Sequence, residues 1–289
     1  MNQPVPCFHL GRELSSCWSR AEDRVVNEVR QRHFGPDEPS ITFLLRGHLR
    51  DTVAEASAER KFEFALRSDL AHAFADLPHD HRLAALPSGL VATVSFHDTH
   101  HEGHSSGADI GLVVRRPVIS RSPFSNHQIR VQRAYARALL AQAKLGRVDR
   151  RGLHPAWRRL TKAQCKIAPA RLEYYSLLLY RILDPAGTTL APFSWQLCSG
   201  YGIVDLKRWL QTGTFPCEKT SVHIVEELSL GRIGTDNDSI VAHVAAPAGR
   251  SWSSIDIKID WPDDRAPPPA IEVPRTHDVL SRQVLTIRH

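Results

Sequence analysis

Three side chains that could do metal or acid–base chemistry lie at the ends of two apolar segments. Asp109 comes directly before one segment, and Gln142 and Lys144 end the other. If the second segment is a strand, Gln142 and Lys144 point to the same face, because alternate residues of a strand share a face. An acid, an amide and a lysine at the end of an apolar sheet are costly to bury. We therefore interpret these three residues as a candidate site.

Together these groups could hold a divalent cation and hydrolyse a phosphodiester bond. A carboxylate supplies the hard oxygen that Mg²⁺ prefers, and water completes the octahedral shell. Lys144 could orient or help deprotonate an attacking water molecule and offset the charge on a phosphate. The expected cofactor is therefore Mg²⁺, or Mn²⁺ in its place.

The pattern of apolar residues predicts the elements that must position this site. In chain order, these are helices over 12–33, from about 39 and over 53–74, strands over 90–96, 108–116 and 136–144, a helix over 154–168 and a buried strand over 171–182. The stretch 129–144 is ambiguous between helix and strand, and we favour a strand over its last part. The order predicts an α/β fold with a mixed central β-sheet flanked by helices.

Composition and charge narrow the class of protein. The 289 residues contain no apolar run long enough to cross a membrane, and the first residues lack the apolar core of a secretory signal. Five cysteines without a CxxC pair favour reduced thiols, and hence a cytoplasmic protein without a membrane association. The formal net charge of +6 is compatible with a polyanionic partner.

Two motifs resemble those of a known enzyme superfamily. GADIGLVV, followed about 30 residues later by AQAKL, resembles the PD-(D/E)xK (restriction-endonuclease-like) nucleases, in branches of which QxK replaces (D/E)xK. Downstream, WRRLTKAQCKIA and EYYSLLLYRI resemble the helix and the Tyr-rich strand of such a branch. The resemblance covers residues 35–183. It implies a metal-dependent DNA endonuclease that serves in bacterial defence against phage or foreign DNA.

The resemblance also implies roles for individual residues. GPDEPSITFLLRGHL is similar to the acidic start of an early family helix, which nominates Glu38 as a second metal-binding carboxylate beside Asp109. Glu102 is the competing candidate. The backbone carbonyl of Ala143 would also face the metal, Gln142 would shape the site, and Lys144 would position the attacking water.

The same resemblance suggests how the chain is organised. Residues 1–183 would comprise a helical N-terminus and a nuclease-like α/β core. Residues 184–289 would form a less regular C-terminal extension of unknown role packed on that core, with a short helix over 203–210 and a strand-like run over 253–261.

Other functions stay open at this point. A catalytically inactive nuclease-like fold could bind nucleic acid or a partner protein, and control by a regulatory partner or a homo-oligomer is compatible with the chain. The histidines of the loop after residue 96 could bind zinc or contact phosphate: His97, His100, His101 and His104. Basic pairs near the site could contact a DNA backbone: Arg115–Arg116, Arg147, Arg150–Arg151 and Arg158–Arg159. The absence of GxxxxGK and GxSxG argues against a P-loop NTPase and an α/β-hydrolase.

Overall fold

The structure is a computed structural model, and it describes residues 2–32, 35–74, 89–96, 108–121, 129–147, 169–245 and 253–259. The helices are α1 (Phe8–Arg32), α2 (Glu38–Ala58), α3 (Lys61–Phe74), the 3₁₀ helix η3 (Pro169–Tyr174), α5 (Ile203–Thr212), α6 (Ser221–Ser229) and α7 (Asp238–Ala245). The strands are β1 (Asn2–Pro4), β2 (Gly89–Phe96), β3 (Ile110–Arg121), β4 (Ile129–Arg147), β5 (Tyr175–Ile182), β6 (Ser194–Leu197), β7 (Glu218–Thr220) and β8 (Ser253–Ile259).

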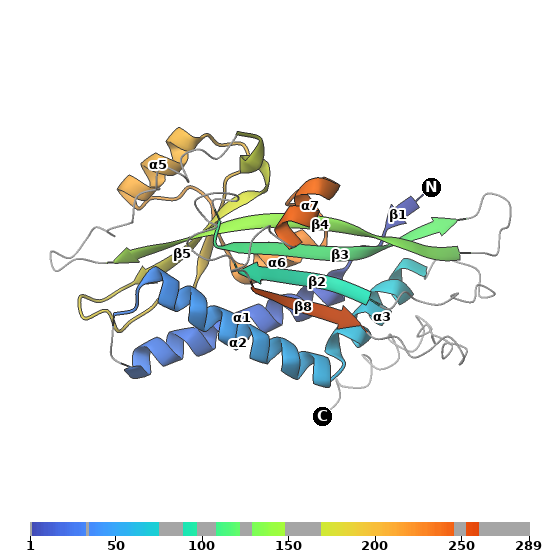
Figure 1. The fold of residues 1–289 in the computed structure, drawn as a ribbon, viewed down its shortest axis with the longest axis horizontal. Helices are drawn as coiled ribbons and strands as arrows, with labels where there is room; N and C mark the ends of the chain where they lie inside the picture. The colour runs from blue at the N-terminus through green and yellow to red at the C-terminus, as the bar shows by residue number, and fades with distance from the viewer. Residues whose placement is uncertain are drawn as a thin grey trace, which may run out of the picture.

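The described strands form one mixed sheet (Figure 1). Its order is β7-β6-β5-β4-β3-β2-β8, and β1 pairs with the far end of β3. The pair β4–β5 is parallel, whereas the other neighbouring strands are antiparallel. The long hairpin of β3 and β4 forms the centre of the sheet, and the strands from the C-terminal part of the chain extend it at both edges.

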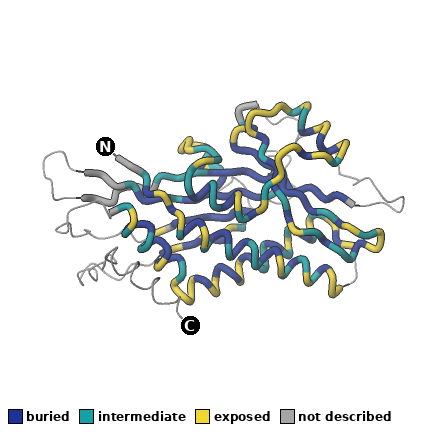
Figure 2. Tube along the Cα trace, turned by 180° about the vertical axis from the view of Figure 1, so that it is seen from behind, coloured by how far each residue is buried: buried dark blue, intermediate teal, exposed yellow. Residues whose placement is uncertain are grey.

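Helices cover both faces of this sheet. One apolar core lies between the sheet and α1, α2, α3 and α6, and a second lies between the opposite face and α5 and α7. Alternate residues of β4 divide between the two cores, with Leu139 and Ala141 in the first and Ala138 and Leu140 in the second. Figure 2 shows the consequence, because the central strands are buried while the helices keep an exposed side.

The predicted α/β class, with a mixed central sheet flanked by helices, is confirmed. The ambiguous stretch 129–144 is a single strand that continues to Arg147. The second helix runs to Ala58, beyond the expected start of the third, and the break lies near Arg60, whose φ of 57° cannot continue a helix. The predicted helix over 154–168 lies outside the described residues.

Residues 184–259 contribute more regular structure than their sequence indicates. The region adds β6 and β7 to one edge of the sheet and β8 to the other, and α6 packs against α1. The expected short helix over 203–210 is present as α5, and the strand-like run from 253 is β8. β8 is amphipathic, since Ile255, Ile257 and Ile259 are buried and the residues between them are exposed.

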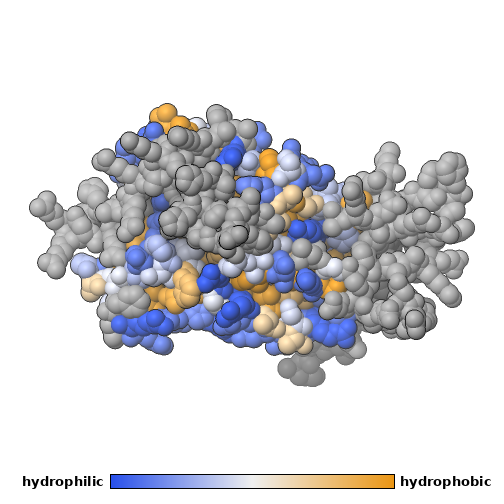
Figure 3. Space-filling view, in the orientation of Figure 1, coloured by the Kyte–Doolittle hydropathy of each residue, from blue (hydrophilic) through white to orange (hydrophobic). Residues whose placement is uncertain are grey.

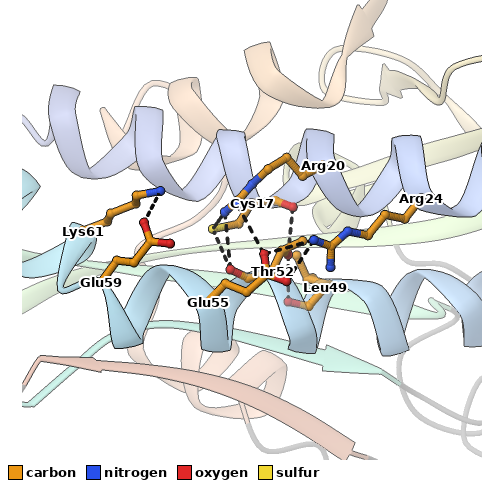
Figure 4. A network of polar contacts seen from close by, with 8 residues as sticks. All are labelled: Cys17, Arg20, Arg24, Leu49, Thr52, Glu55, Glu59 and Lys61. Carbon is orange, nitrogen blue, oxygen red and sulfur yellow. Dashed lines mark hydrogen bonds and ion pairs between the residues drawn. The ribbon is translucent and has the colours of Figure 1, made fainter.

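A polar seam holds α1 against α2 (Figure 4). The hydroxyl of Thr52 is buried and donates to the carbonyl of Cys17 at 3.0 Å, and the thiol of Cys17 donates to the carbonyl of Thr52 at 3.6 Å. At the solvent side of the seam, Arg24 and Arg20 pair with Glu55 at 2.9 and 3.4 Å. The seam fixes the axial position of α2, and therefore of the residues at its N-terminus.

A buried carboxyl group, that of Glu22, joins α1 to β6 and α6. Glu22 accepts hydrogen bonds from the indole N–H of Trp18 at 2.7 Å and from the hydroxyl of Ser221. Ser221 in turn accepts from the indole N–H of Trp195 at 2.7 Å. Burial raises the pKa of Glu22 to about 8, although both hydrogen bonds oppose the shift. Glu22 is therefore mostly protonated at neutral pH in the folded chain.

This raised pKa predicts a pH-dependent stability. A carboxyl group with a higher pKa in the folded state stabilises most below its unfolded pKa of about 4.3, and that stabilisation is lost as the pH rises towards 8. We expect Glu22 to lower the free energy of unfolding by up to about 1.4 kcal/mol per pH unit across this window. Glu22→Gln should flatten the slope and raise stability at pH 8. Urea unfolding at pH 5 to 8, followed by tryptophan fluorescence, measures both effects, and an unchanged slope in the variant would contradict the assignment.

Candidate active site

Strand β4 extends beyond the start of its neighbour β3. Among the described residues no strand pairs with this side of β4 after Ala141, and we call it the open edge of β4. The backbone N–H of Asp109 donates to the carbonyl of Ala141 at 2.9 Å, at the point where β3 begins. Residues 142–147 continue along β5 on the other side. The N–H groups of Ala143 and Leu145 lie on the open edge, where β3 no longer supplies acceptors.

Two carboxylates provide those acceptors. Asp109 Oδ2 accepts from the N–H of Ala143 at 2.6 Å, and Glu38 Oε2 accepts from the N–H of Leu145 at 2.9 Å. Residues 143 and 145 are one strand repeat apart, about 6.6 Å. The carboxylates of the β3 start and the α2 start are therefore fixed side by side along β4, although 71 positions separate Glu38 from Asp109 in the sequence.

The start of α2 is built to hold Glu38 in this place. Asp37 is the N-cap residue, with extended backbone angles, and its carboxylate accepts from the N–H of Ser40 at 2.9 Å. Pro39 lies in the first turn, where its missing N–H costs no helical hydrogen bond. Glu38 itself is a first-turn acid, which the positive end of the helix dipole favours.

Gln142 and Lys144 complete the cluster from β4. Their side chains are 0% and 3% exposed. The amide nitrogen of Gln142 donates to Asp109 Oδ2, and to the carbonyl of Ala143 at 3.2 Å. Lys144 Nζ lies 3.5 Å from Glu38 Oε1. The four predicted side chains thus meet at one edge of β4, with Asp109 beside Gln142 and Glu38 beside Lys144.

The donor set fits a hard divalent cation. It contains two carboxylates, and the carbonyl of Ala143 and the amide of Gln142 lie next to the carboxylate of Asp109. Gln142 Oε1 is buried without a hydrogen-bond partner, and a buried amide oxygen of this kind is costly unless it binds something. Oxygen atoms of these types are the ligands that Mg²⁺ takes. Within the described ranges no group of three or more His, Cys, Asp and Glu side chains is arranged to hold a metal ion.

Several predicted candidates fall on parts of the chain that the structure does not describe. Glu102 and the four histidines of its loop lie outside the described residues, as do Arg150–Arg151 and Arg158–Arg159. Arg147 ends β4, but its side chain is not described. Of the two competing acids, Glu38 contacts β4 directly, by accepting from the N–H of Leu145.

Arg115 and Arg116 are described, and they lie about 20 Å along β3 from Asp109. Arg115 donates to the hydroxyl of Thr93 at 3.0 Å. Arg116 is buried, donates to the carbonyl of Leu230 at 2.8 Å and stacks on the ring of Tyr135. Arg115 thus contacts β2 and Arg116 anchors the segment after α6 to the sheet, so neither flanks the candidate site.

Two residues near the site were not predicted from the sequence. The hydroxyl of Tyr180, on β5, lies 3.2 Å from the hydroxyl of Thr42, on α2. Burial raises the pKa of Tyr180 well above its ordinary value, and the charges of Asp109 and Glu38 act in the same direction. The signal for Thr42 is its spacing, four residues after Glu38. The signal for Tyr180 is a phenol directly after the three leucines of β5.

The surface over α1 and α2 mixes hydrophilic and hydrophobic side chains (Figure 3). Exposed aromatic rings occur on each of the first three helices, at Phe8, Phe43 and Phe64. Single exposed rings are ordinary on a protein surface and assign no function. Of the helices that the structure describes, none combines the length and the apolar character that crossing a bilayer requires.

Comparison of the chain with protein-family models, with curated proteins and with solved structures finds no match. The function must therefore be argued from the site itself.

The unpartnered amide oxygen of Gln142 leads to a prediction about stability when a carboxylate replaces the amide. Gln142→Glu places a third acid beside Asp109, so without metal the repulsion of like charges should lower the melting temperature. A loss of about 1 kcal/mol corresponds to roughly 2–4 °C in a chain of this size. Added Mn²⁺ should reverse the loss, since it binds the folded site. Thermal unfolding in EDTA and in Mn²⁺ measures both effects.

Gln196→Glu is the matched control for this experiment. Gln196 is also a buried strand glutamine, but its amide contacts Leu197 and Cys217 instead of an acid. Its variant should lose stability without recovering in Mn²⁺. Equal recovery of both variants would show that Mn²⁺ acts elsewhere on the chain.

Proposed function

We propose that this protein is a metal-dependent DNA endonuclease of the PD-(D/E)xK class that hydrolyses phosphodiester bonds. The observation that carries the proposal is the convergence of Glu38, Asp109, Gln142 and Lys144 at the open edge of β4. Two acids, an amide and a lysine from three separate elements are brought into one cluster, and its two β4 members are almost fully buried. Structural roles alone rarely require such a set.

Each residue has a part in this proposal. Asp109, Glu38 and the carbonyl of Ala143 hold Mg²⁺ or Mn²⁺, and the amide oxygen of Gln142 shapes the site beside them. The cation supplies positive charge that polarises the phosphate and acidifies a bound water molecule. Lys144 positions the attacking water and stabilises the charge that develops on the phosphate.

The burial of Lys144 supports this role. Its ammonium group is held 3.5 Å from Glu38 in surroundings that exclude most water. Charge interactions are stronger in such surroundings than in bulk solvent, so a phosphate beside Lys144 is attracted more strongly than at an exposed lysine. The i, i+2 spacing also places Lys144 on the same strand face as Gln142.

DNA is the proposed substrate, and defence against phage or foreign DNA is the proposed role. The net charge of +6 favours association with a polyanion. The resemblance of GADIGLVV and AQAKL to a defence-associated superfamily supports the role. We place the activity in the cytoplasm, in keeping with the free thiols of Cys7, Cys17 and Cys198.

A second function has an observation of its own. Asp109 already accepts protein hydrogen bonds from Ala143 and from the amide of Gln142. A site whose acid is satisfied by the protein can persist without a cation. The alternative is therefore a nuclease-like fold that binds nucleic acid or a partner protein without cutting.

Cleavage of plasmid and linear DNA in Mg²⁺, Mn²⁺ or EDTA tests the proposal. We expect the parent chain to cut only with a divalent cation. Lys144→Ala should reduce the rate by at least about 100-fold, the usual scale for a group that assists proton transfer. Asp109→Asn should abolish cutting, because it removes a charged metal ligand but keeps an oxygen for the N–H of Ala143.

Lys258→Ala is the control, since Lys258 is an exposed lysine on β8, at the far edge of the sheet. It should cut like the parent. Cutting that survives in Lys144→Ala and Asp109→Asn would place the activity elsewhere. DNA binding without cutting by the parent would favour the binding module.

A further inference from the structure

We propose that Tyr180 is a positioning residue for Glu38. Its buried hydroxyl, acting through Thr42, fixes the first turn of α2 against the sheet and holds the Glu38 carboxylate in the cluster. The inference rests on the proposed function, because it assumes that the cluster binds a divalent metal ion. It adds β5 to the elements that determine how well the site binds that metal.

The hydrogen bonds form a chain with a defined direction. The hydroxyl of Thr42 donates to the backbone carbonyl of Glu38 at 3.0 Å. A hydroxyl has one hydrogen, so Thr42 must accept from the hydroxyl of Tyr180, 3.2 Å away. Tyr180 is thus the donor at the start of the chain, and the carbonyl of Glu38 is its end. The raised pKa of Tyr180 keeps this donor protonated.

The sheet register places the two residues that fix Glu38, Tyr180 and Leu145, next to each other. Tyr180 of β5 is the partner of Leu145 of β4 in the parallel ladder. The N–H of Leu145 donates to the Glu38 carboxylate. Tyr180 therefore contacts the backbone of Glu38 through Thr42, and its strand partner Leu145 contacts the side chain of Glu38 directly.

Packing alone does not account for this hydroxyl. Tyr180 is 0% exposed and lies on the face of β5 that joins the first core, with its ring 4.6 Å from the ring of Phe193. A phenylalanine would bury the same ring without the cost of desolvating a hydroxyl. What the hydroxyl adds is the contact with Thr42, and through it an orientation for the helix start.

The consequence for the site follows from the geometry of a helix start. Thr42 is four residues after Glu38, so its hydroxyl can turn back to the Glu38 carbonyl only in a rotamer that points toward the preceding turn. Tyr180 donates to that hydroxyl and favours the same rotamer. Without this donor, the first turn of α2 loses a polar contact with β5 that helps to hold the Glu38 carboxylate in the cluster.

The test compares Tyr180→Phe, Thr42→Val and the double variant with the parent chain. The primary measurement is the Mn²⁺ dissociation constant, obtained from free Mn²⁺ by electron paramagnetic resonance. We expect each single variant to weaken Mn²⁺ binding by about 10-fold, the low end for groups that orient a metal ligand. The double variant should be no weaker than the singles, because both substitutions break one chain of hydrogen bonds. Thr42→Ser keeps the hydroxyl and should bind like the parent.

Tyr175→Phe is the matched control, because Tyr175 is an equally buried tyrosine of β5 on the opposite sheet face. Its melting temperature and that of Tyr180→Phe report general destabilisation. Parent-like Mn²⁺ binding by Tyr180→Phe, or an equal loss in Tyr175→Phe, would overturn the inference and leave the proposed function standing. A parent chain that neither binds Mn²⁺ nor cuts DNA would overturn both.

Discussion

The unmatched length of two neighbouring strands is the constraint on which the candidate site depends. Where β3 begins, β4 has six residues still to run, and its N–H groups on that side need acceptors inside the protein. Buried N–H groups are almost always satisfied, because an unmade hydrogen bond costs about 1–3 kcal/mol. Asp109 and Glu38 supply charged acceptors to two of them, the N–H groups of Ala143 and Leu145. The same contacts that complete the sheet also gather two acids, so the fold and the site share one set of hydrogen bonds.

The rest of the architecture keeps these acids in position. Asp109 is fixed by its place at the start of β3 and needs only the β3–β4 register. Glu38 lies at the end of a helix, so its position depends on everything that sets α2: the N-cap at Asp37, the seam around Thr52 and the tie to β5. A small axial shift of α2 would separate Glu38 from Leu145. The contacts along α2 therefore bear on the site although most of them lie far from it.

Local patterns were sufficient for the parts of the site that depend on local structure. Asp109, Gln142 and Lys144 could be nominated because they are polar residues beside apolar runs and strand alternation puts Gln142 and Lys144 on one face, although β4 continues past Lys144 to Arg147. Glu38 needed a family resemblance, since nothing in the sequence near residue 38 indicates a contact with residue 145. Tyr180 and Thr42 were missed because their contact depends on how α2 packs against β5, and the two residues are far apart in the sequence. The strands β6 and β7 were not predicted, because strands of four and three residues carry too few alternating positions to give a pattern.

The choice of glutamine at position 142 has a consequence for how the site would work. With Glu38, Asp109 and Lys144 charged, the cluster carries a formal charge of −1, whereas an acid at position 142 would make it −2. The smaller charge weakens the attraction for a free divalent cation but removes the repulsion that a third buried carboxylate would impose on the metal-free fold. A phosphate at the site would bring negative oxygens that compensate for the missing acid. Cation and nucleic acid would then bind with positive coupling, because each supplies charge that the other lacks. A neutral glutamine would therefore let the cluster persist without a metal ion, and the phosphate of the substrate would supply the oxygen ligand that the glutamine does not.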